Sequence, residues 1–222
     1  MTLLRYIRAD GQRVPAEYET VEVDRDGRLA GWRSVAPLAV GSFEGDLAAD
    51  EVDDLRALVD RAQAIPEPDV MRRPGASSET LELGDGFALE VGGLDSDDDP
   101  VWSELVVRGR DLLARQTAFP VAAIGLAADG GRLELLGTHP LELDLTDAVV
   151  SRYAWTPDGA LAGEMSAPLE AGSRVHAEPG WSLDLPPAAD ALPPDAVVQT
   201  LVRFVIVAGG VPVPVEVGSE VP

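Results

Sequence analysis

Short apolar runs separated by turn residues dominate the sequence after Phe119 and Pro120. The runs include VAAIGL, RLELLG, LELDL, VVSRYAW, WSLDL and VVQTLVRFVIV, and the segments between runs include ADGG, PDG, EPG and PPAADALPP. Strands that recur about every ten residues with turn chemistry between them are typical of antiparallel β-sandwiches and barrels. We therefore expect residues 119–222 to form an all-β domain with a sandwich-like arrangement of antiparallel strands.

Two amphipathic segments in the N-terminal half predict helices. The first, AADEVDDLRALVDRAQA at residues 48–64, places its apolar residues at three- and four-residue steps, which form one stripe along a helix. That stripe contains Val52, Leu55, Leu58, Val59 and Ala62. The second segment, DPVWSELVVRGRDLLARQ at residues 99–116, has an equivalent stripe of Trp102, Leu105, Val106, Leu112 and Leu113. Each stripe should face a hydrophobic core.

A β-hairpin pattern precedes each predicted helix. YETVEVDRDGRLAGW at residues 18–32 alternates valine with glutamate and turns at an Asp-Gly pair, and SETLELGDGFALEV at residues 78–91 has the same design. The motifs ETVEV and ETLEL lie sixty residues apart, and each is followed by a turn, a strand and a helix. This spacing suggests a duplicated hairpin-plus-helix unit, with chance similarity of two acidic strands as the alternative.

Together these patterns predict an α+β fold in two domains. Residues 1–118 would form β-hairpins with two amphipathic helices, and residues 119–222 would form the antiparallel β-sandwich-like domain. The stretch at residues 65–78 is rich in proline, glycine and serine, which predicts a surface loop between the two hairpin-plus-helix segments. The pattern leaves open whether the two domains share one core.

The charge balance restricts the partners that the chain can bind. The 222 residues contain 39 acidic and 17 basic side chains, for a formal net charge of −22, and residues 35–104 hold 18 of the acids against four arginines. Such a chain repels nucleic acid and anionic membranes, because binding to either uses clustered Lys and Arg. The acids are explained by solubility or a high-salt cytoplasm, with binding of a basic partner or a cation as the alternative. The candidate docking residues are Asp50, Glu51, Asp53, Asp54, Asp95, Asp97 and Asp98.

The stretch LDSDDDPVW at residues 94–102 has three interpretations: a helix start, an acidic docking surface and a metal loop. A calcium loop of EF-hand type requires glycine at its sixth position and glutamate at its twelfth, where this chain has Pro100 and Val106. Asp99 is instead a favoured helix N-cap, and Pro100 fits the first helical position because proline has no N–H to lose. The pattern favours the helix start, and we assign no metal site.

Residues for catalysis are scarce. The chain has no Cys and no Lys, which excludes a thiol nucleophile, a Schiff-base lysine and a P-loop lysine. Neither a G-x-S-x-G motif nor a dinucleotide-binding loop occurs, so we assign no catalytic residue and no cofactor. The two histidines are His139, with Glu142 three residues later, and His176, with Glu178 two residues later. An alternating strand would place His176 and Glu178 on one side, as a proton-transfer pair or a solvated face.

Residues 41–62, GSFEGDLAADEVDDLRALVDRA, resemble a segment of the emfourin-type inhibitors of thermolysin-like metalloproteases. In that resemblance Phe43 and Gly45 match a glycine-rich stretch, Leu55 to Ala62 match an acidic leucine-rich helix, and Trp102 to Leu113 match a second helix. It covers residues 41–116, and it implies a hairpin-and-helix arrangement and inhibition of a thermolysin-like protease. The glycine motif lies later here than in that family, and the β-rich half has no counterpart in it.

These observations lead to three hypotheses about function. The first is a non-enzymatic, acidic binding protein of the cytoplasm, because catalytic motifs are missing and no segment approaches the roughly 20 apolar residues of a membrane span. The second is a protein inhibitor of a thermolysin-like protease, as the resemblance implies. The third is a hydrolase or isomerase that uses carboxylates with His176.

Overall fold

The computed structural model shows a chain that is mostly β. Of the residues that it describes, 55% lie in strands and 18% in helices. The expected α+β class is therefore wrong, and the cause lies in two strands that the sequence patterns missed, β1 (Thr2–Asp10) and β5 (Ala39–Asp46). Contiguous apolar residues hide the alternation of β1, and glycines interrupt that of β5. The structure describes residues 1–37, 39–68, 77–84, 86–91, 100–169, 172–187 and 196–219.

Residue contacts divide the chain into two compact units. The first unit contains residues 1–33 and 42–120, and the second contains residues 34–41 and 121–222. These units differ from a single cut at residue 118 in two segments: residues 34–41 belong with the C-terminal part of the chain, and residues 119–120 belong with the N-terminal part. The division of the sequence into domains 1–118 and 119–222 stays a prediction, and each unit is described by itself.

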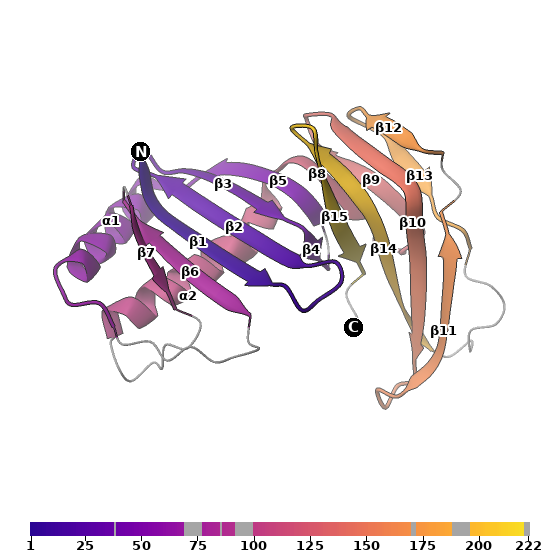
Figure 1. Ribbon diagram of the computed structural model, residues 1–222, viewed down its shortest axis with the longest axis horizontal. Coiled ribbons are helices and arrows are strands. Elements are labelled where there is room, and N and C mark those ends of the chain that lie inside the picture. The colour runs from indigo at the N-terminus through magenta and orange to yellow at the C-terminus, as the bar shows by residue number, and fades with distance from the viewer. Residues whose placement is uncertain are drawn as a thin grey trace. The chain divides into compact units, whose positions relative to one another are not determined.

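Six strands in the order β5-β3-β2-β1-β6-β7 form the sheet of the first unit (Figure 1). Only the end of β5 from Ser42 onward belongs to this unit. Neighbouring strands from β3 to β7 are antiparallel, as expected for strands joined by short turns. The bounds not yet given are β2 Glu17–Asp24, β3 Arg28–Arg33, β6 Ser78–Leu83 and β7 Phe87–Glu90.

Strand β1 lies between the two strands that carry the related motifs ETVEV and ETLEL. On one side Ile7 is opposite Thr20 of β2, and on the other it is opposite Thr80 of β6. Every neighbouring position matches in the same way, so that Arg5 lies between Glu22 and Glu82. The two motifs therefore meet the same central strand in the same register.

Both long helices pack on one face of this sheet. They are α1 (Ala49–Gln63) and α2 (Pro100–Arg115), and a short 3-10 helix, η1 (Gln116–Ala118), continues α2. Their buried residues include every member of the two apolar stripes expected from the sequence. All of these except Val52 join Leu4, Tyr6 and Leu81 of the sheet in one hydrophobic cluster. Burial of such stripes is the main source of helix stability in a protein of this kind. The expected N-cap Asp99 lies outside the described residues.

The second unit consists of strands in two hydrogen-bonded groups (Figure 1). One group has the order β13-β9-β8, and the other has the order β11-β10-β14-β15-β4, with β12 paired to β10. Pairing is antiparallel except between β15 and β4. The strands are β4 Val35–Ala36, β8 Pro120–Leu126, β9 Arg132–Gly137, β10 Leu141–Trp155, β11 Leu161–Pro168, β12 Arg174–Ala177, β13 Ser182–Asp184, β14 Val197–Ala208 and β15 Val211–Gly218.

Strand β15 shows how proline limits pairing. It pairs with β14 along its whole length, including Pro212 and Pro214, and β4 pairs with it only at Glu216 and Val217. Because proline has no N–H to donate, the second neighbour can join only beyond Pro214. Neither long helix of the described chain is long and apolar enough to cross a membrane.

Candidate functional site

The acidic residues singled out from the sequence do not gather into one site in the described chain. Asp50, Glu51, Asp53 and Asp54 lie in the first turns of α1, where the helix dipole favours negative charge. Glu51 faces α2, and Asp53 pairs instead with Arg56 of its own helix at 2.6 Å. The remaining three, Asp95, Asp97 and Asp98, lie outside the described residues.

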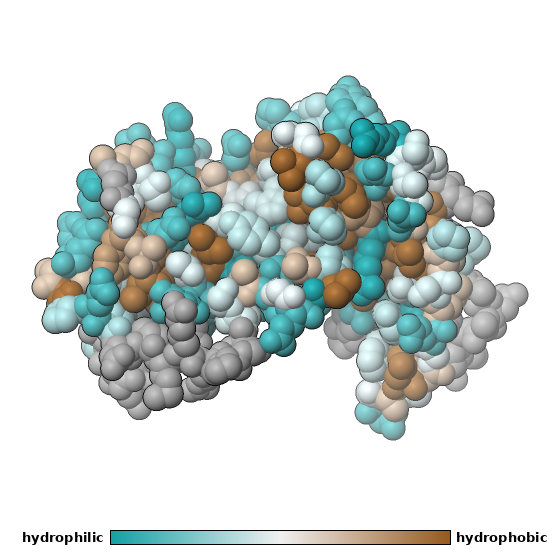
Figure 2. Space-filling model, in the orientation of Figure 1, coloured by the Kyte–Doolittle hydropathy of each residue, from teal (hydrophilic) through white to brown (hydrophobic). Residues whose placement is uncertain are grey.

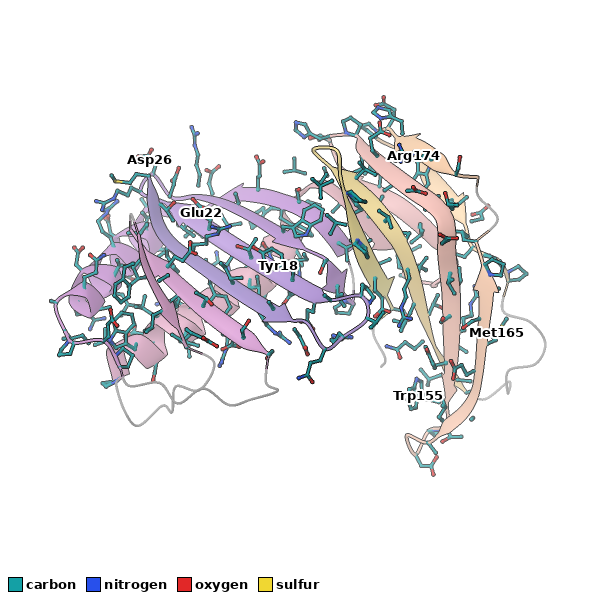
Figure 3. The ribbon with its side chains drawn as sticks, in the orientation of Figure 1. Tyr18, Glu22, Asp26, Trp155, Met165 and Arg174 are labelled. Carbon is teal, nitrogen blue, oxygen red and sulfur yellow. The ribbon has the colours of Figure 1, made fainter. Side chains whose placement is uncertain are left out.

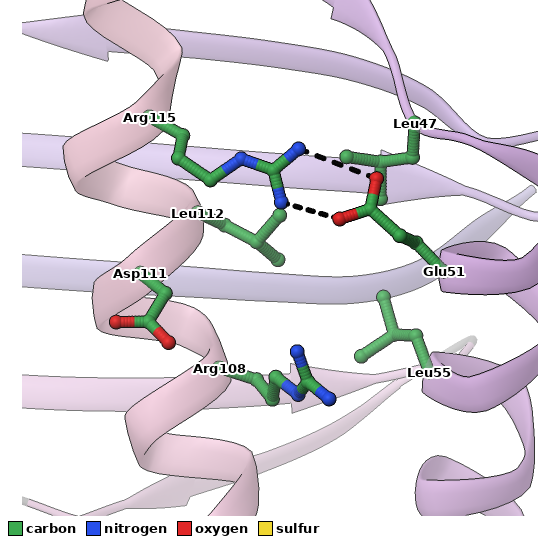
Figure 4. Close-up of a pocket in the computed structure, with 7 residues that line it drawn as sticks. All are labelled: Leu47, Glu51, Leu55, Arg108, Asp111, Leu112 and Arg115. Atoms are coloured by element: carbon green, nitrogen blue, oxygen red, sulfur yellow. Dashed lines mark hydrogen bonds and ion pairs between the residues drawn. The ribbon is translucent and has the colours of Figure 1, made fainter.

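A pocket opens between α1 and α2 on the surface of the first unit (Figure 4). Its floor is aliphatic, with Leu55 and Leu112 each 5% exposed and Leu47 half-buried beside them. Its rim carries four charges, two of each sign. The residues that line it are Leu47, Glu51, Leu55, Arg108, Asp111, Leu112 and Arg115.

One end of this pocket is closed by an ion pair between Glu51 and Arg115. The two guanidinium nitrogens Nη1 and Nη2 of Arg115 donate to Oε1 and Oε2 of Glu51 at 2.6 and 3.3 Å (Figure 4). Oε2 also accepts from the backbone N–H of Ala48 at 3.2 Å. The Arg115 hydrogen bonds, followed by the Ala48 N–H, hold the pKa of the Glu51 carboxyl below its usual range. Glu51 is therefore ionised and fixed in orientation.

The other end of the pocket carries a guanidinium that no described carboxylate bonds directly. Arg108 is exposed, and within the part of the chain that the structure describes it makes no ion pair or side-chain hydrogen bond, although its charge helps to lower the pKa of Glu51. It lies two helical turns before Arg115, so both side chains leave the same face of α2. Figure 4 shows its side chain directed toward α1 and that of Asp111 directed away from it. The pocket thus offers one free cation above an aliphatic floor.

Sequence patterns did not single out Arg108 or Arg115. The periodicity of the two helices identified which faces are buried, but it could not say which residues of α1 oppose which residues of α2. One signal was present: arginines two turns apart on α2 and a glutamate at the start of α1 can face each other when the helices pack side by side. Comparing the positions of the charged residues on the two predicted helices would therefore have identified this pair.

His176 forms a second, separate cluster on the second unit. Its Nδ1 pairs with Glu142 of β10, and its Nε2 lies 3.0 Å from Glu178. The three side chains are at least half exposed. Glu142, expected beside His139, is thus opposite His176 in the β10–β12 pairing. The bonded Glu142 carboxylate, aided by Glu178, raises the pKa of His176, and both ring nitrogens face carboxylates.

Metal ligation finds no support in the described residues, because no group of three His, Cys, Asp or Glu side chains is placed to hold an ion.

Phe43 and Gly45, which carried the resemblance to protease inhibitors, are packed against other residues of the fold. Phe43 is fully buried, and a Cβ at Gly45 would lie 2.9 Å from the ring of Phe119. Phe43 is therefore not presented on the surface as a contact for a protease, and the half-buried Gly45 packs against Phe119.

An aliphatic patch covers the β14–β15 hairpin (Figure 2). Val211 is 61% exposed there, and Val205, Val207 and Val213 are half-buried. Elsewhere on the second unit, Trp155 is the last residue of β10 and Met165 lies in the middle of β11 (Figure 3). Tyr18 and Glu22 belong to the sheet of the first unit (Figure 3). The sheet surface near Glu22 carries arginine–glutamate ion pairs, such as Arg5 with Glu82 at 3.3 Å, but the helix pocket combines charged groups with an aliphatic floor and is the better-defined candidate site.

Comparison with known proteins adds no name to this geometry: no family model, no curated protein and no solved structure matches the chain.

Proposed function

We propose that the protein is a non-enzymatic binding protein of the cytoplasm that docks a protein partner at the pocket between α1 and α2. The observation that carries the proposal is the exposed guanidinium of Arg108, which has no partner among the described residues and lies above an aliphatic floor. Pockets that combine apolar lining with a few directed polar groups are the usual form of binding sites. The exposed acids Asp50, Asp53 and Asp54 would contact basic groups at the edge of the same partner.

The chemistry of the pocket supports binding over catalysis. Arginine stays protonated in proteins, so Arg108 and Arg115 cannot accept a proton. The carboxylate of Glu51 is occupied by Arg115, and Asp111 is directed away from α1. No hydroxyl, thiol or imidazole lines the pocket to serve as a nucleophile. What these residues can do is recognise charge and shape.

The proposal is tested with the full-length protein as bait in a lysate of the source cells. A partner should be retained by the unaltered protein and lost, by about tenfold or more, with Arg108→Glu, because reversing a charge at the contact repels the group that Arg108 attracts. Arg61→Glu is the matched control, since Arg61 is an exposed arginine of α1 outside the pocket. Washes at low salt and at about 0.5 M salt separate a charge-dominated contact from an apolar one.

Two outcomes would contradict the proposal. If no protein is captured at either salt concentration, the proposed binding function is wrong. If the Arg108 and Arg61 variants capture the partner equally well, the partner does not bind at the pocket. The same purified protein also tests the protease-inhibitor hypothesis and the enzyme hypothesis. Inhibition of thermolysin-like proteases at micromolar concentration would favour the inhibitor hypothesis, and a turnover abolished by His176→Ala would favour an enzyme.

A further inference from the structure

We infer that the group bound at Arg108 is the side-chain carboxylate of an acidic residue flanked by aliphatic residues in a protein partner. This inference rests on the proposed function and names the chemistry of its partner. It follows from how the two helices face each other, from the neighbouring ion pair, and from the lining of the pocket.

The Glu51–Arg115 pair shows how this pocket holds a carboxylate. The contact is two-pronged, with both carboxylate oxygens accepting from one guanidinium. Planar, two-pronged recognition of carboxylates is the interaction for which arginine is best suited. The carboxylate comes from a helix that packs beside α2, so a side chain presented by a neighbouring segment is the kind of ligand this surface already accommodates.

Arg108 repeats the position of Arg115 without its partner. Along α2 it lies two turns before Arg115, and along α1 the residue one turn after Glu51 is Leu55 (Figure 4). The next ion pair between the helices joins Arg61 to Glu104 at 3.4 Å, and Leu55 lines the pocket beside Arg108. Leu55 belongs to the hydrophobic cluster and is 5% exposed, so the fold requires an apolar side chain there. In the described residues no carboxylate bonds Arg108 directly, so a carboxylate that does so would come from another molecule.

The pocket also selects the neighbours of that carboxylate. Leu47, Leu55 and Leu112 present aliphatic surface beside the guanidinium, and apolar groups that cover it would be removed from water together with the ion pair. The four rim charges cancel locally, with Glu51 and Asp111 against Arg108 and Arg115. Because salt screens charges beyond about 8 Å at physiological ionic strength, the remaining acids of the chain do not prevent an acidic side chain from reaching Arg108.

The test uses two capped peptides and the full-length protein labelled with ¹⁵N. The probes are acetyl-Leu-Glu-Leu-amide, whose only charge is the side-chain carboxylate, and acetyl-Leu-Gln-Leu-amide, its neutral counterpart. We expect the glutamate peptide to shift the Nε–Hε resonance of Arg108 in a saturable way and to leave that of Arg61 in place. The glutamine peptide should bind about tenfold or more weakly, because a charge-assisted hydrogen bond is lost.

Variants and a small-molecule probe make each outcome decisive. Arg108→Gln should abolish saturable binding and Arg108→Lys should retain part of it, with thermal unfolding showing that both variants are folded. Equal binding of the two peptides would overturn the inference, as would equal shifts at Arg61. Binding of free isovalerate as tight as that of the glutamate peptide would make the site one for small carboxylic acids. If neither peptide binds but a partner is still captured in an Arg108-dependent way, the inference about the carboxylate is wrong and the proposed binding function is kept.

Discussion

Gly31 of β3 lies beneath the side chain of Gln116, which is fully buried. A Cβ at this position would overlap Oε1 of Gln116 and would lie 2.7 Å from the backbone oxygen of Thr20. Neither side-chain polar atom of Gln116 has a hydrogen-bond partner in the described chain. The packing of η1 against β3 therefore requires a residue without a side chain at position 31.

Gly31→Ala should lower the free energy of unfolding by about 3 kcal/mol, because overpacking a filled site forces the backbone or the buried amide to shift. Chemical denaturation monitored by tryptophan fluorescence measures this change. Gly11→Ala is the matched control, since nothing lies within 4 Å of its Cβ and its backbone conformation suits alanine. Equal stability of the Gly31 variant and the control would show that the Gln116 side chain has another place to go.

His176 gives the second unit a pH-dependent contact. Its raised folded-state pKa means that the protonated ring is bound more strongly in the folded protein than in the unfolded chain. That stabilisation is fully present below the ordinary histidine pKa of about 6.5 and is lost as the pH rises through the higher folded-state value. The relevant window thus lies above the ordinary pKa.

Glu142→Gln should move the pKa of His176 back toward its ordinary value, because the Glu142 carboxylate is the main cause of the shift. Titration of the His176 ring protons by NMR measures it directly. Glu164→Gln, on the neighbouring strand β11, is the control and should leave the titration in place. A titration unchanged by the loss of Glu142 would show that the pair does not persist in solution.

At the scale of elements, the similarity of the motifs ETVEV and ETLEL has a physical explanation that does not require duplication. Both flank β1, and each must present threonine to Ile7, glutamate to Arg5 and an aliphatic residue to Tyr6. Cross-strand pairs of this kind are the unit of sheet stability. Two strands that meet the same neighbour under the same constraints arrive at similar sequences, whatever their ancestry.

If this explanation holds, the strands are interchangeable at modest cost. The double change Leu81→Val and Leu83→Val gives β6 the sequence ETVEV, and we expect a folded protein that is less stable by about 2 kcal/mol, from the loss of one buried methylene at each site. Urea denaturation measures this loss. The change Leu81→Asp, at a fully buried position, is the contrasting variant and should prevent folding. Failure of the valine variant to fold would contradict the explanation.

Elements were predictable from sequence to the extent that their periodicity was unbroken. The stripes of α1 and α2 satisfy this condition, and so do the hairpins β2–β3 and β6–β7. Strand β5 does not, because Gly41 adopts a φ of 126° and a Cβ there would collide with the backbone of Ala122. The candidate site was more difficult to predict than the elements. The role of Arg108 depends on which residues face it across the helix interface, and the sequence pattern does not show which residues face each other.

At the scale of the whole molecule, the second unit depends on a segment that precedes it by about eighty residues in the chain. Strand β4 in residues 34–41 pairs with Glu216 and Val217, and Glu216 donates its backbone N–H to Ser34 at 2.9 Å. A fragment of residues 121–222 lacks this neighbour, and the edge of β15 would then be unpaired. Unpaired edges of this kind promote association between chains.

Adding a synthetic peptide of residues 33–41 to the 121–222 fragment should therefore stabilise it. We expect the thermal midpoint to rise by about 4–8 °C for each kcal/mol that binding contributes, and to rise with the logarithm of the peptide concentration once the fragment is saturated. A peptide of the same composition in scrambled order is the control and should have no effect. A fragment that melts at the same temperature with and without the peptide would show that β4 is dispensable.

The pairing of β4 with β15 also has a consequence for how the protein is made. On the ribosome, residues 35 and 36 emerge early, whereas their partners 216 and 217 are joined to the chain about 180 residues later. At a synthesis rate of roughly 5–20 residues per second, β4 waits on the order of ten seconds or more before its place in the sheet exists. During that interval its short length and the proline after Ala36 limit what else it can pair with.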